Sequence, residues 1–173
     1  MPDYREHPAK PVRLQGDDMV VLDAGDETVW FYLDADGWEG LHARRLAPDL
    51  ARIAAVPVFA YGVGLGDEVQ VRESDEGAAV ATAVVRSAGN VTFRVIFPAQ
   101  AGAEAADHWR SLLTGLAPYG CWLDVWSPQL VAVSAGADVA AEVAHYLTAR
   151  EEGGELVFEA VSASAASSPS RTL

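Results

Sequence analysis

The sequence predicts an α+β fold, in which an N-terminal antiparallel β lobe packs against a C-terminal ferredoxin-like βαββαβ lobe. The first half of the chain contains short segments rich in β-branched and aromatic residues, separated by turn sequences with Gly and Asp. The second half alternates strand-like and helix-like segments in the order strand, helix, strand, strand, helix, strand. Hydrophobic residues make up 50% of the chain and charged residues 21%, which is typical of a folded globular protein.

The β lobe is predicted from hydrophobic runs that end at turn signals. The sequence Asp34-Ala35-Asp36-Gly37 is a turn between two segments that we expect to form a hairpin. Residues 56–61 are apolar but contain Pro57, which predicts an edge strand or an irregular crossing. The strands expected in this half are residues 28–33, 41–46, 68–73 and 78–86.

The C-terminal lobe is predicted from clearer periodicity. A helix is expected over residues 104–116, because its apolar residues recur at helical spacing. Asp138 is expected to cap the N-terminus of a second helix, which ends at Gly153. The strands expected here are residues 91–97, 121–126, 130–134 and 156–161.

These elements divide the chain into four parts. Residues 1–18 are polar and contain three prolines, so we expect a flexible N-terminal arm. The antiparallel β lobe follows over residues 19–89 and the ferredoxin-like lobe over residues 90–161. The last part, residues 162–173, is rich in Ser and Ala, and this composition predicts a disordered tail.

The charge of the chain excludes several classes of partner. The formal net charge is -13, from 12 Lys+Arg and 25 Asp+Glu, and there is no basic cluster. Nucleic-acid backbones and anionic membrane surfaces both require surplus Lys and Arg, so we expect neither as a partner. The N-terminus lacks an apolar segment of the signal-peptide type, and the single cysteine cannot form an internal disulfide. These features predict a cytoplasmic protein.

The sequence contains none of the familiar catalytic or metal-binding motifs with the residue spacing that they require. The glycines of residues 62–66 match neither phosphate-binding loop, and the acidic turn at residues 34–37 lacks the flanking ligands of a calcium loop. The four histidines show no metal-ligand spacing. Cys121 is interpreted as a buried thiol and not a nucleophile, because alternation places it on the strand face under the helices. The sequence therefore indicates no metal and no cofactor.

The strongest candidate site lies on the sheet face opposite the helices. Alternation places Arg94 on this face of one strand, and Trp122, Asp124 and Trp126 on the same face of another. Ala132 is small and lies on the strand between them, so Arg94 and Asp124 are expected to reach each other. One interpretation is that the β lobe covers this face and buries the pair. The alternative is an open platform for a ligand or partner, because Trp and Arg are frequent at interfaces.

Two further candidates lie where the lobes meet. Asn90 belongs to a polar stretch between the two halves, which is either a loop with unusual backbone angles or a binding element. Asp67 follows the glycine-rich turn. If Asp67, Arg94, Asp124 and a histidine surrounded one deep cleft, an enzyme would be favoured.

Four segments of the chain carry a family resemblance. The segments are Val29-Trp30-Phe31, Val56-Pro57-Val58-Phe59-Ala60-Tyr61-Gly62-Val63, Gly66-Asp67-Glu68-Val69 and Ser87-Ala88-Gly89-Asn90-Val91-Thr92-Phe93-Arg94-Val95-Ile96-Phe97. They occur in the order of the bacterial "domain of unknown function 4265" family, which this sequence resembles over residues 27–161. This sequence departs from the family pattern at residues 88–90, where members more often have a Gly-His pair. The resemblance implies a bacterial cytoplasmic setting and no particular activity.

The sequence as a whole favours a non-enzymatic function. No cluster of titratable residues is evident, so we expect a small binding or interaction protein that is accessory to a bacterial system. Its partner would be another protein or a small molecule. The alternative is an enzyme that uses a cleft between the two lobes. The six residues predicted to bind a ligand or partner are Arg94, Asp124, Trp122, Trp126, Asn90 and Asp67.

Overall fold

The computed structural model describes residues 3–35, 37–99 and 105–161 of the chain. Strands dominate, and two α-helices follow in the C-terminal half, so the fold is of the mixed α+β kind. Among the described residues, no helix has both the length and the apolar character needed to cross a membrane. The elements are β1 (Asp3–Glu6), β2 (Val12–Gln15), β3 (Asp18–Val21), β4 (Glu27–Tyr32), β5 (Gly37–Ala47), β6 (Leu50–Ile53), β7 (Glu68–Glu73), β8 (Ala79–Arg86), β9 (Val91–Ile96), α1 (Ala105–Leu116), the 3-10 helix η1 (Ala117–Tyr119), β10 (Trp122–Ser127), β11 (Leu130–Ala135), α2 (Ala140–Glu152) and β12 (Val157–Val161).

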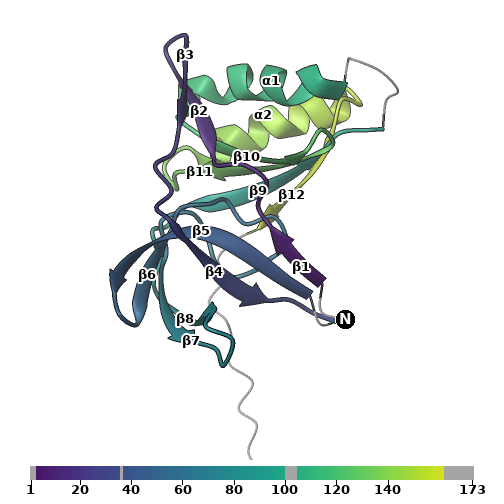
Figure 1. Ribbon diagram of the computed structural model, residues 1–173. Helices are drawn as coiled ribbons and strands as arrows, with labels where there is room; N and C mark the ends of the chain where they lie inside the picture. Colours follow the sequence, from purple (N-terminus) through teal and green to yellow (C-terminus); the bar gives the residue numbers. More distant parts are fainter. Residues whose placement is uncertain (1–2, 36, 100–104, 162–173) are drawn as a thin grey trace, which may run out of the picture.

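The strands form two sheets. The first has the order β1-β5-β4-β8-β7-β6, and an additional pairing of β5 with β6 closes its five later strands into a barrel. The second sheet has the order β12-β9-β11-β10-β2-β3, and all of its neighbours are antiparallel. Helices α1 and α2 cover one face of the second sheet, and the barrel lies on the other side (Figure 1). The sheet that carries Arg94 and Asp124 is thus the middle layer of the molecule.

The barrel contains the predicted hairpin and one strand that the sequence did not predict. β4 and β5 pair in antiparallel register, with Val29 opposite Leu41, as expected for residues 28–33 and 41–46. The structure adds β6, a strand of four residues that follows a turn. A segment this short shows too few alternations for its strand character to be recognised in a sequence.

The N-terminal segment differs from the expected flexible arm. β1 adds to the barrel in parallel with β5, whereas β2 and β3 form a hairpin at the edge of the second sheet. Val12 and Leu14 pack against the core beneath the helices, and this burial stabilises the hairpin. The N-terminal segment therefore contributes strands to both sheets before the chain forms β4 to β8 of the barrel. The predicted tail, residues 162–173, lies outside the described residues.

Three buried clusters hold these layers together. One lies between the second sheet and the helices and includes Cys121, which is buried as predicted. Another fills the barrel around Val29 and Leu41. The third lies between the barrel and the second sheet, where Ala132 packs with residues that include Trp122 and Trp126. The tryptophan face is therefore covered, which agrees with the first of the two interpretations.

Candidate functional site

A long segment of the barrel covers the open face of the second sheet. Residues 54–67 connect β6 to β7, and we call them the crossing segment. Val56, Val58 and Leu65 of this segment are buried against Ala132 of β11. Its backbone forms no regular strand, which is the irregular crossing that Pro57 allowed. Its backbone N–H and C=O groups therefore need partners other than a strand ladder.

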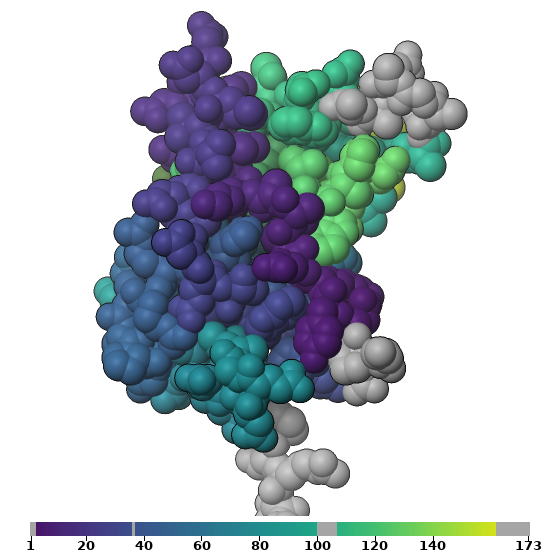
Figure 2. Space-filling model, viewed as in Figure 1, coloured from purple at the N-terminus to yellow at the C-terminus, as the bar shows by residue number. Residues whose placement is uncertain are grey.

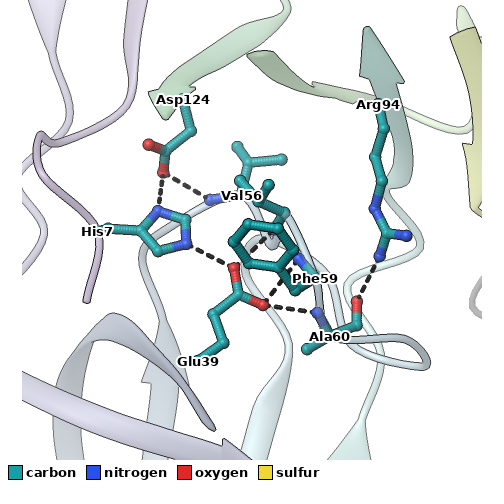
Figure 3. Close-up of polar contacts among 8 residues, drawn as sticks. His7, Glu39, Val56, Phe59, Ala60, Arg94 and Asp124 are labelled. Carbon is teal, nitrogen blue, oxygen red and sulfur yellow. Dashed lines mark hydrogen bonds and ion pairs between the residues drawn. The ribbon is translucent and has the colours of Figure 1, made fainter. Parts of the chain in front are cut away.

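Two carboxylates supply many of these partners, and a histidine joins the two carboxylates. His7 lies between β1 and β2, and its imidazole bridges two carboxylates from different layers (Figure 3). His7 Nδ1 donates to Asp124 Oδ2 at 2.9 Å, and His7 Nε2 donates to Glu39 Oε1 at 2.7 Å. The side chains of all three residues have 0% exposed area.

The two carboxylates also bind the crossing segment. Glu39 accepts hydrogen bonds from the backbone N–H groups of Val58, Phe59 and Ala60, at 2.7, 3.0 and 2.6 Å. Asp124 accepts one from the backbone N–H of Val56 at 3.1 Å. Four amides that would otherwise be buried without partners are thereby satisfied. We refer to His7, Glu39 and Asp124 as the buried charge network.

The protonation state of the network follows from its surroundings. Burial lowers the pKa of His7, but the hydrogen bonds and charges of Asp124 and Glu39 outweigh burial and raise this pKa to about 9. Burial raises the pKa of Glu39, but the hydrogen bond and charge of His7 and the amides of Val58 and Ala60 bring it below its ordinary value. At neutral pH the network is therefore an imidazolium between carboxylates. The amides of Val58 and Ala60 help to stabilise the negative charge of Glu39.

The geometry of the network suits a structural clamp. An acid–base catalyst must come within hydrogen-bonding distance of its substrate. The complete burial of all three side chains prevents such contact in this conformation. The network joins the N-terminal segment, β5, the crossing segment and β10, so it fixes the barrel to the second sheet.

Arg94 does not pair with Asp124, contrary to the sequence-based expectation. The predicted register is correct, because Ala132 lies opposite both residues. However, Arg94 donates to Glu159 Oε1 on the other neighbouring strand at 2.8 Å, and to the carbonyl of Ala60 at 3.0 Å. Its guanidinium also stacks on the ring of Tyr61, 4.1 Å from the centroid. The crossing segment fills the space over Ala132 and separates the two side chains. Arg94 and Asp124 therefore both bind the crossing segment, but Arg94 pairs with Glu159 and Asp124 pairs with His7.

Asp67 and Asn90 hold the far end of the crossing segment. Asp67 accepts hydrogen bonds from the backbone N–H groups of Gly64 and Ala88, at 2.8 and 2.7 Å. The side-chain amide of Asn90 donates to the carbonyl of Leu65 at 2.8 Å. These contacts fix a turn in which Gly66 has a φ of +87°. That backbone conformation favours glycine.

The two tryptophans have different surroundings. Trp126 packs edge-on against His7 and Phe59, with ring centroids 5.4 and 5.0 Å apart. It therefore forms part of the wall around the buried charge network. Trp122 lies under the guanidinium of Arg13, which is 4.5 Å from the ring centroid. Trp122 also lines a cleft between the two lobes, whereas Trp126 lines a different pocket.

This cleft lies between the barrel and the second sheet and has a volume of about 560 Å³. It contains Asn90 and Trp122 from the predicted site residues, but not Asp67, Arg94, Asp124 or Trp126. The barrel supplies Arg44 and Arg52. We call this space the interlobe cleft. Two of the predicted residues thus line the cleft, and the others lie elsewhere, around the crossing segment.

The start of helix α2 forms one side of the interlobe cleft. Asp138 was expected to cap this helix, but the capping position is Val139, and no side chain bonds to the first turn. Asp138 Oδ1 instead lies close to Gly136, only 2.6 Å from where a Cβ atom would be. Helix N–H groups without caps carry a partial positive charge. Val139 and Asp138 both line the cleft, so this charge is at its wall.

The charged groups of the interlobe cleft are open to solvent. Arg44 pairs with Asp23 at 2.6 Å, and their side chains are 53% and 83% exposed. Arg52 pairs with Glu68 at 2.8 Å, and their side chains are 51% and 13% exposed. Ion pairs whose arginine is exposed to water are weak and exchange readily with other ions. Both arginines can therefore turn toward a ligand at little cost.

Sequence reasoning missed His7, Glu39, Arg44 and Arg52. A signal for Glu39 was present, because strict alternation places it on the inner face of its strand with Leu41 and Ala43. A charged residue at such a position indicates a buried partner. His7 gave no comparable signal, since its partners are 32 and 117 residues away along the chain.

Comparisons with known proteins agree with the family resemblance. The family model described as "Domain of unknown function (DUF4265)" matches residues 39–158. A solved structure described as a novel crystal structure of a hypothetical protein from Neisseria gonorrhoeae is similar, with a TM-score of 0.62 and 16% sequence identity. The similarity covers 78% of this chain and 93% of the other, and at this identity it shows the fold alone. Among curated proteins, none matches this chain.

Proposed function

The chain belongs to the DUF4265 family, and from the part of the fold that the family match covers we propose that it is a small binding protein with a ligand site in the interlobe cleft. The matched residues 39–158 include both arginines of the cleft, Asn90, Trp122 and the start of α2. The family name itself specifies no activity. The proposal therefore depends on the chemistry of the cleft.

The observation that carries the proposal is the combination of volume and lining. Pockets that bind small molecules have volumes of roughly 300–1,000 Å³ and combine apolar walls with a few polar groups. The interlobe cleft has a volume of about 560 Å³ and offers the ring of Trp122, the amide of Asn90 and two guanidinium groups. This lining suits a planar small molecule that carries a negative charge.

Positive charge at two sides of the cleft supports an anionic ligand. Arg44 and Arg52 come from the barrel, and the uncapped N-terminus of α2 comes from the opposite lobe. An anion between them would replace Asp23 and Glu68 as the partner of the arginines. Asp23 and Asp138 also line the cleft, so a ligand must displace or avoid these carboxylates.

Binding is favoured over catalysis by where the titratable groups lie. The strongest acid–base grouping that we describe is the buried charge network, and it is closed to solvent. The cleft offers guanidinium, carboxylate, amide and hydroxyl groups, which can recognise a ligand through charge and hydrogen bonds. We therefore favour a binding protein, and an enzyme that uses the same cleft is the less favoured alternative.

Thermal unfolding in the presence of small molecules tests this function. A ligand that binds only the folded state raises Tm in proportion to the logarithm of its concentration. We expect planar carboxylates or phosphates from a metabolite panel to raise Tm, and Arg52→Gln to reduce that rise. Arg72→Gln is the matched control, because Arg72 is an exposed arginine that does not line the cleft. The proposal fails if no panel compound raises Tm, or if both variants respond as the unaltered protein does.

We also infer that the C-terminal lobe has a ferredoxin-like arrangement. Within the second sheet, the four strands of this lobe follow the order β12-β9-β11-β10, and the two helices lie on one face. The element order β9, α1, β10, β11, α2, β12 supports the same inference. The family and the single free cysteine support a bacterial cytoplasmic setting, which fractionation of the native host would test.

A further inference from the structure

The outer face of the barrel carries a groove lined by aromatic residues. Its volume is about 410 Å³, and its lining residues differ from those of the interlobe cleft. Tyr4, Trp30 and Trp38 form one side, and the turn between β7 and β8 forms the other. In Figure 2 this turn, in teal, lies on the same face as β1, in purple. We call this surface the aromatic groove.

Strand pairing explains why the aromatic residues gather there. Trp38 of β5 lies directly opposite both Tyr4 of β1 and Tyr32 of β4, so the three side chains point to the same side of the sheet. Trp30 lies opposite Gly40, and a Cβ atom at Gly40 would come within 2.9 Å of the Trp30 ring. Glycine at position 40 therefore lets the indole lie across β5.

The aromatic rings hold one another in fixed orientations. Tyr4 and Trp30 pack edge-to-face with centroids 5.4 Å apart, and Tyr32 and Trp38 do so at 5.2 Å. Tyr4 and Tyr32 nevertheless remain 57% and 60% exposed. Aromatic side chains that are both exposed and held in place are typical of binding surfaces, because little entropy is lost when a partner docks.

The rim of the aromatic groove is acidic. Asp75 and Glu76 lie in the β7–β8 turn, and both are exposed. Within the described chain, neither carboxylate forms an ion pair, and the groove lining contains no Lys or Arg. The faces of aromatic rings attract cations, and the two carboxylates attract them further. The charge of the groove therefore selects for a positively charged occupant.

We propose that the aromatic groove docks an arginine- or lysine-containing segment of a partner protein, with the cationic side chain against Trp30 and Trp38 and its charge facing Asp75 and Glu76. The volume of about 410 Å³ accommodates a long side chain and part of its backbone. This interaction would be independent of the ligand in the interlobe cleft. It would be a second function of the same chain.

Charge distinguishes this partner from other molecules that stack on aromatic residues. Single-stranded nucleic acids stack their bases on such rings, but they also need positive charge along the backbone. The acidic rim and the net charge of -13 oppose phosphate. A basic peptide satisfies both the rings and the rim.

Selection from a displayed library of random peptides tests the proposal. The unaltered protein should enrich sequences that contain Arg or Lys. A selected peptide, labelled with a fluorophore, is then titrated with protein variants. We expect Trp38→Ala to weaken binding about tenfold or more, and Trp38→Phe to retain most of it. Removing both rim charges with Asp75→Asn and Glu76→Gln should weaken binding about fivefold.

Matched controls keep the experiment decisive. Asp17→Asn with Asp18→Asn removes two exposed charges from the β2–β3 hairpin and should leave peptide affinity unchanged. Arg52→Gln in the interlobe cleft should also leave it unchanged, so a failure here is separate from a failure of the small-molecule site. The proposal is overturned if selected peptides lack basic residues, if the rim and control variants lose affinity equally, or if a labelled single-stranded oligonucleotide binds the groove more tightly than the peptide does. Circular dichroism of each variant confirms that the fold is intact.

Discussion

The buried charge network and the interlobe cleft combine the same kinds of side chain in opposite environments. In the network, an imidazolium lies between two carboxylates that have no exposed area, and both carboxylates also accept hydrogen bonds from backbone amides. In the cleft, Arg44 and Arg52 pair directly with carboxylates, and at least half of each arginine side chain is exposed. The ion pairs of the two regions have similar lengths, but the buried pairs affect the stability of the fold more than the exposed pairs do.

The comparison shows which charges maintain the fold and which are available to a ligand. Removing one member of a buried ion pair leaves its partner without compensation, which is strongly destabilising. Exposed pairs contribute little, because water replaces either partner. Mutations in the two regions should accordingly separate structure from binding.

The largest expected effect is at Glu39. Glu39→Gln removes the charge that faces His7 and weakens hydrogen bonds to three amides of the crossing segment. We expect a loss of about 3–5 kcal/mol in the free energy of unfolding, measured by urea denaturation. A loss below about 1 kcal/mol would contradict the structural role of the network.

The second effect is a dependence of stability on pH. The folded pKa of His7, about 9, is above its ordinary value of 6.5, so the folded state binds this proton more tightly than the unfolded state does. The stabilisation is complete below pH 6.5 and is lost as the pH rises through about 9. The expected loss is about 3 kcal/mol over this window.

His7→Met provides the control for this pH dependence. The variant should be less stable at neutral pH, and its stability should change little between pH 6.5 and about 9. Burial raises the pKa of Cys121 from its ordinary 9.0 to about 12, so the thiol contributes only at higher pH. An equal slope in the variant and the unaltered protein would assign the titration to another group.

A smaller effect is expected at Arg94. Arg94→Met removes hydrogen bonds to Glu159 and to the carbonyl of Ala60, and we expect a loss of about 2 kcal/mol. Combined with Asp124→Asn, the losses should add within about 0.5 kcal/mol, because the two residues share no direct contact. The combination of His7→Met with Asp124→Asn should be far from additive. Strong coupling between Arg94 and Asp124 would restore the pairing expected from the sequence.

The smallest effect is expected at the exposed pair of the cleft. Asp23→Asn should leave the free energy of unfolding almost unchanged, because the Asp23 side chain is 83% exposed. The same urea denaturation measures it. A cost comparable to that of Glu39→Gln would remove the distinction between the two regions.

Much of the fold was predictable because its periodicity is local. The strand face with Trp122 and Trp126 and the buried position of Cys121 both follow from alternation along one strand. The register that places Ala132 between Arg94 and Asp124 follows from the order of the elements. Local patterns of this kind survive tertiary packing because burial enforces them.

The candidate site was predicted only in part, because its contacts are distant along the chain. The choice of partner for Arg94 depends on Glu159 and on how the crossing segment lies, and neither is encoded near Arg94. His7 was placed in a flexible arm because its neighbours are prolines and charged residues. The interlobe cleft combines β-lobe arginines with the start of α2, which no single motif records.

The long sequence separation between β2 and β10 has a consequence for the order of folding. Val12 pairs with Leu123 of β10, so β2 finds its place only after β10 has been synthesised. Closing so long a loop is slow compared with forming a hairpin or a helix. The barrel strands β4 to β8 precede β10 along the chain, so they can pair before β10 is available. His7 would then enter its site late, as the step that joins two lobes already formed.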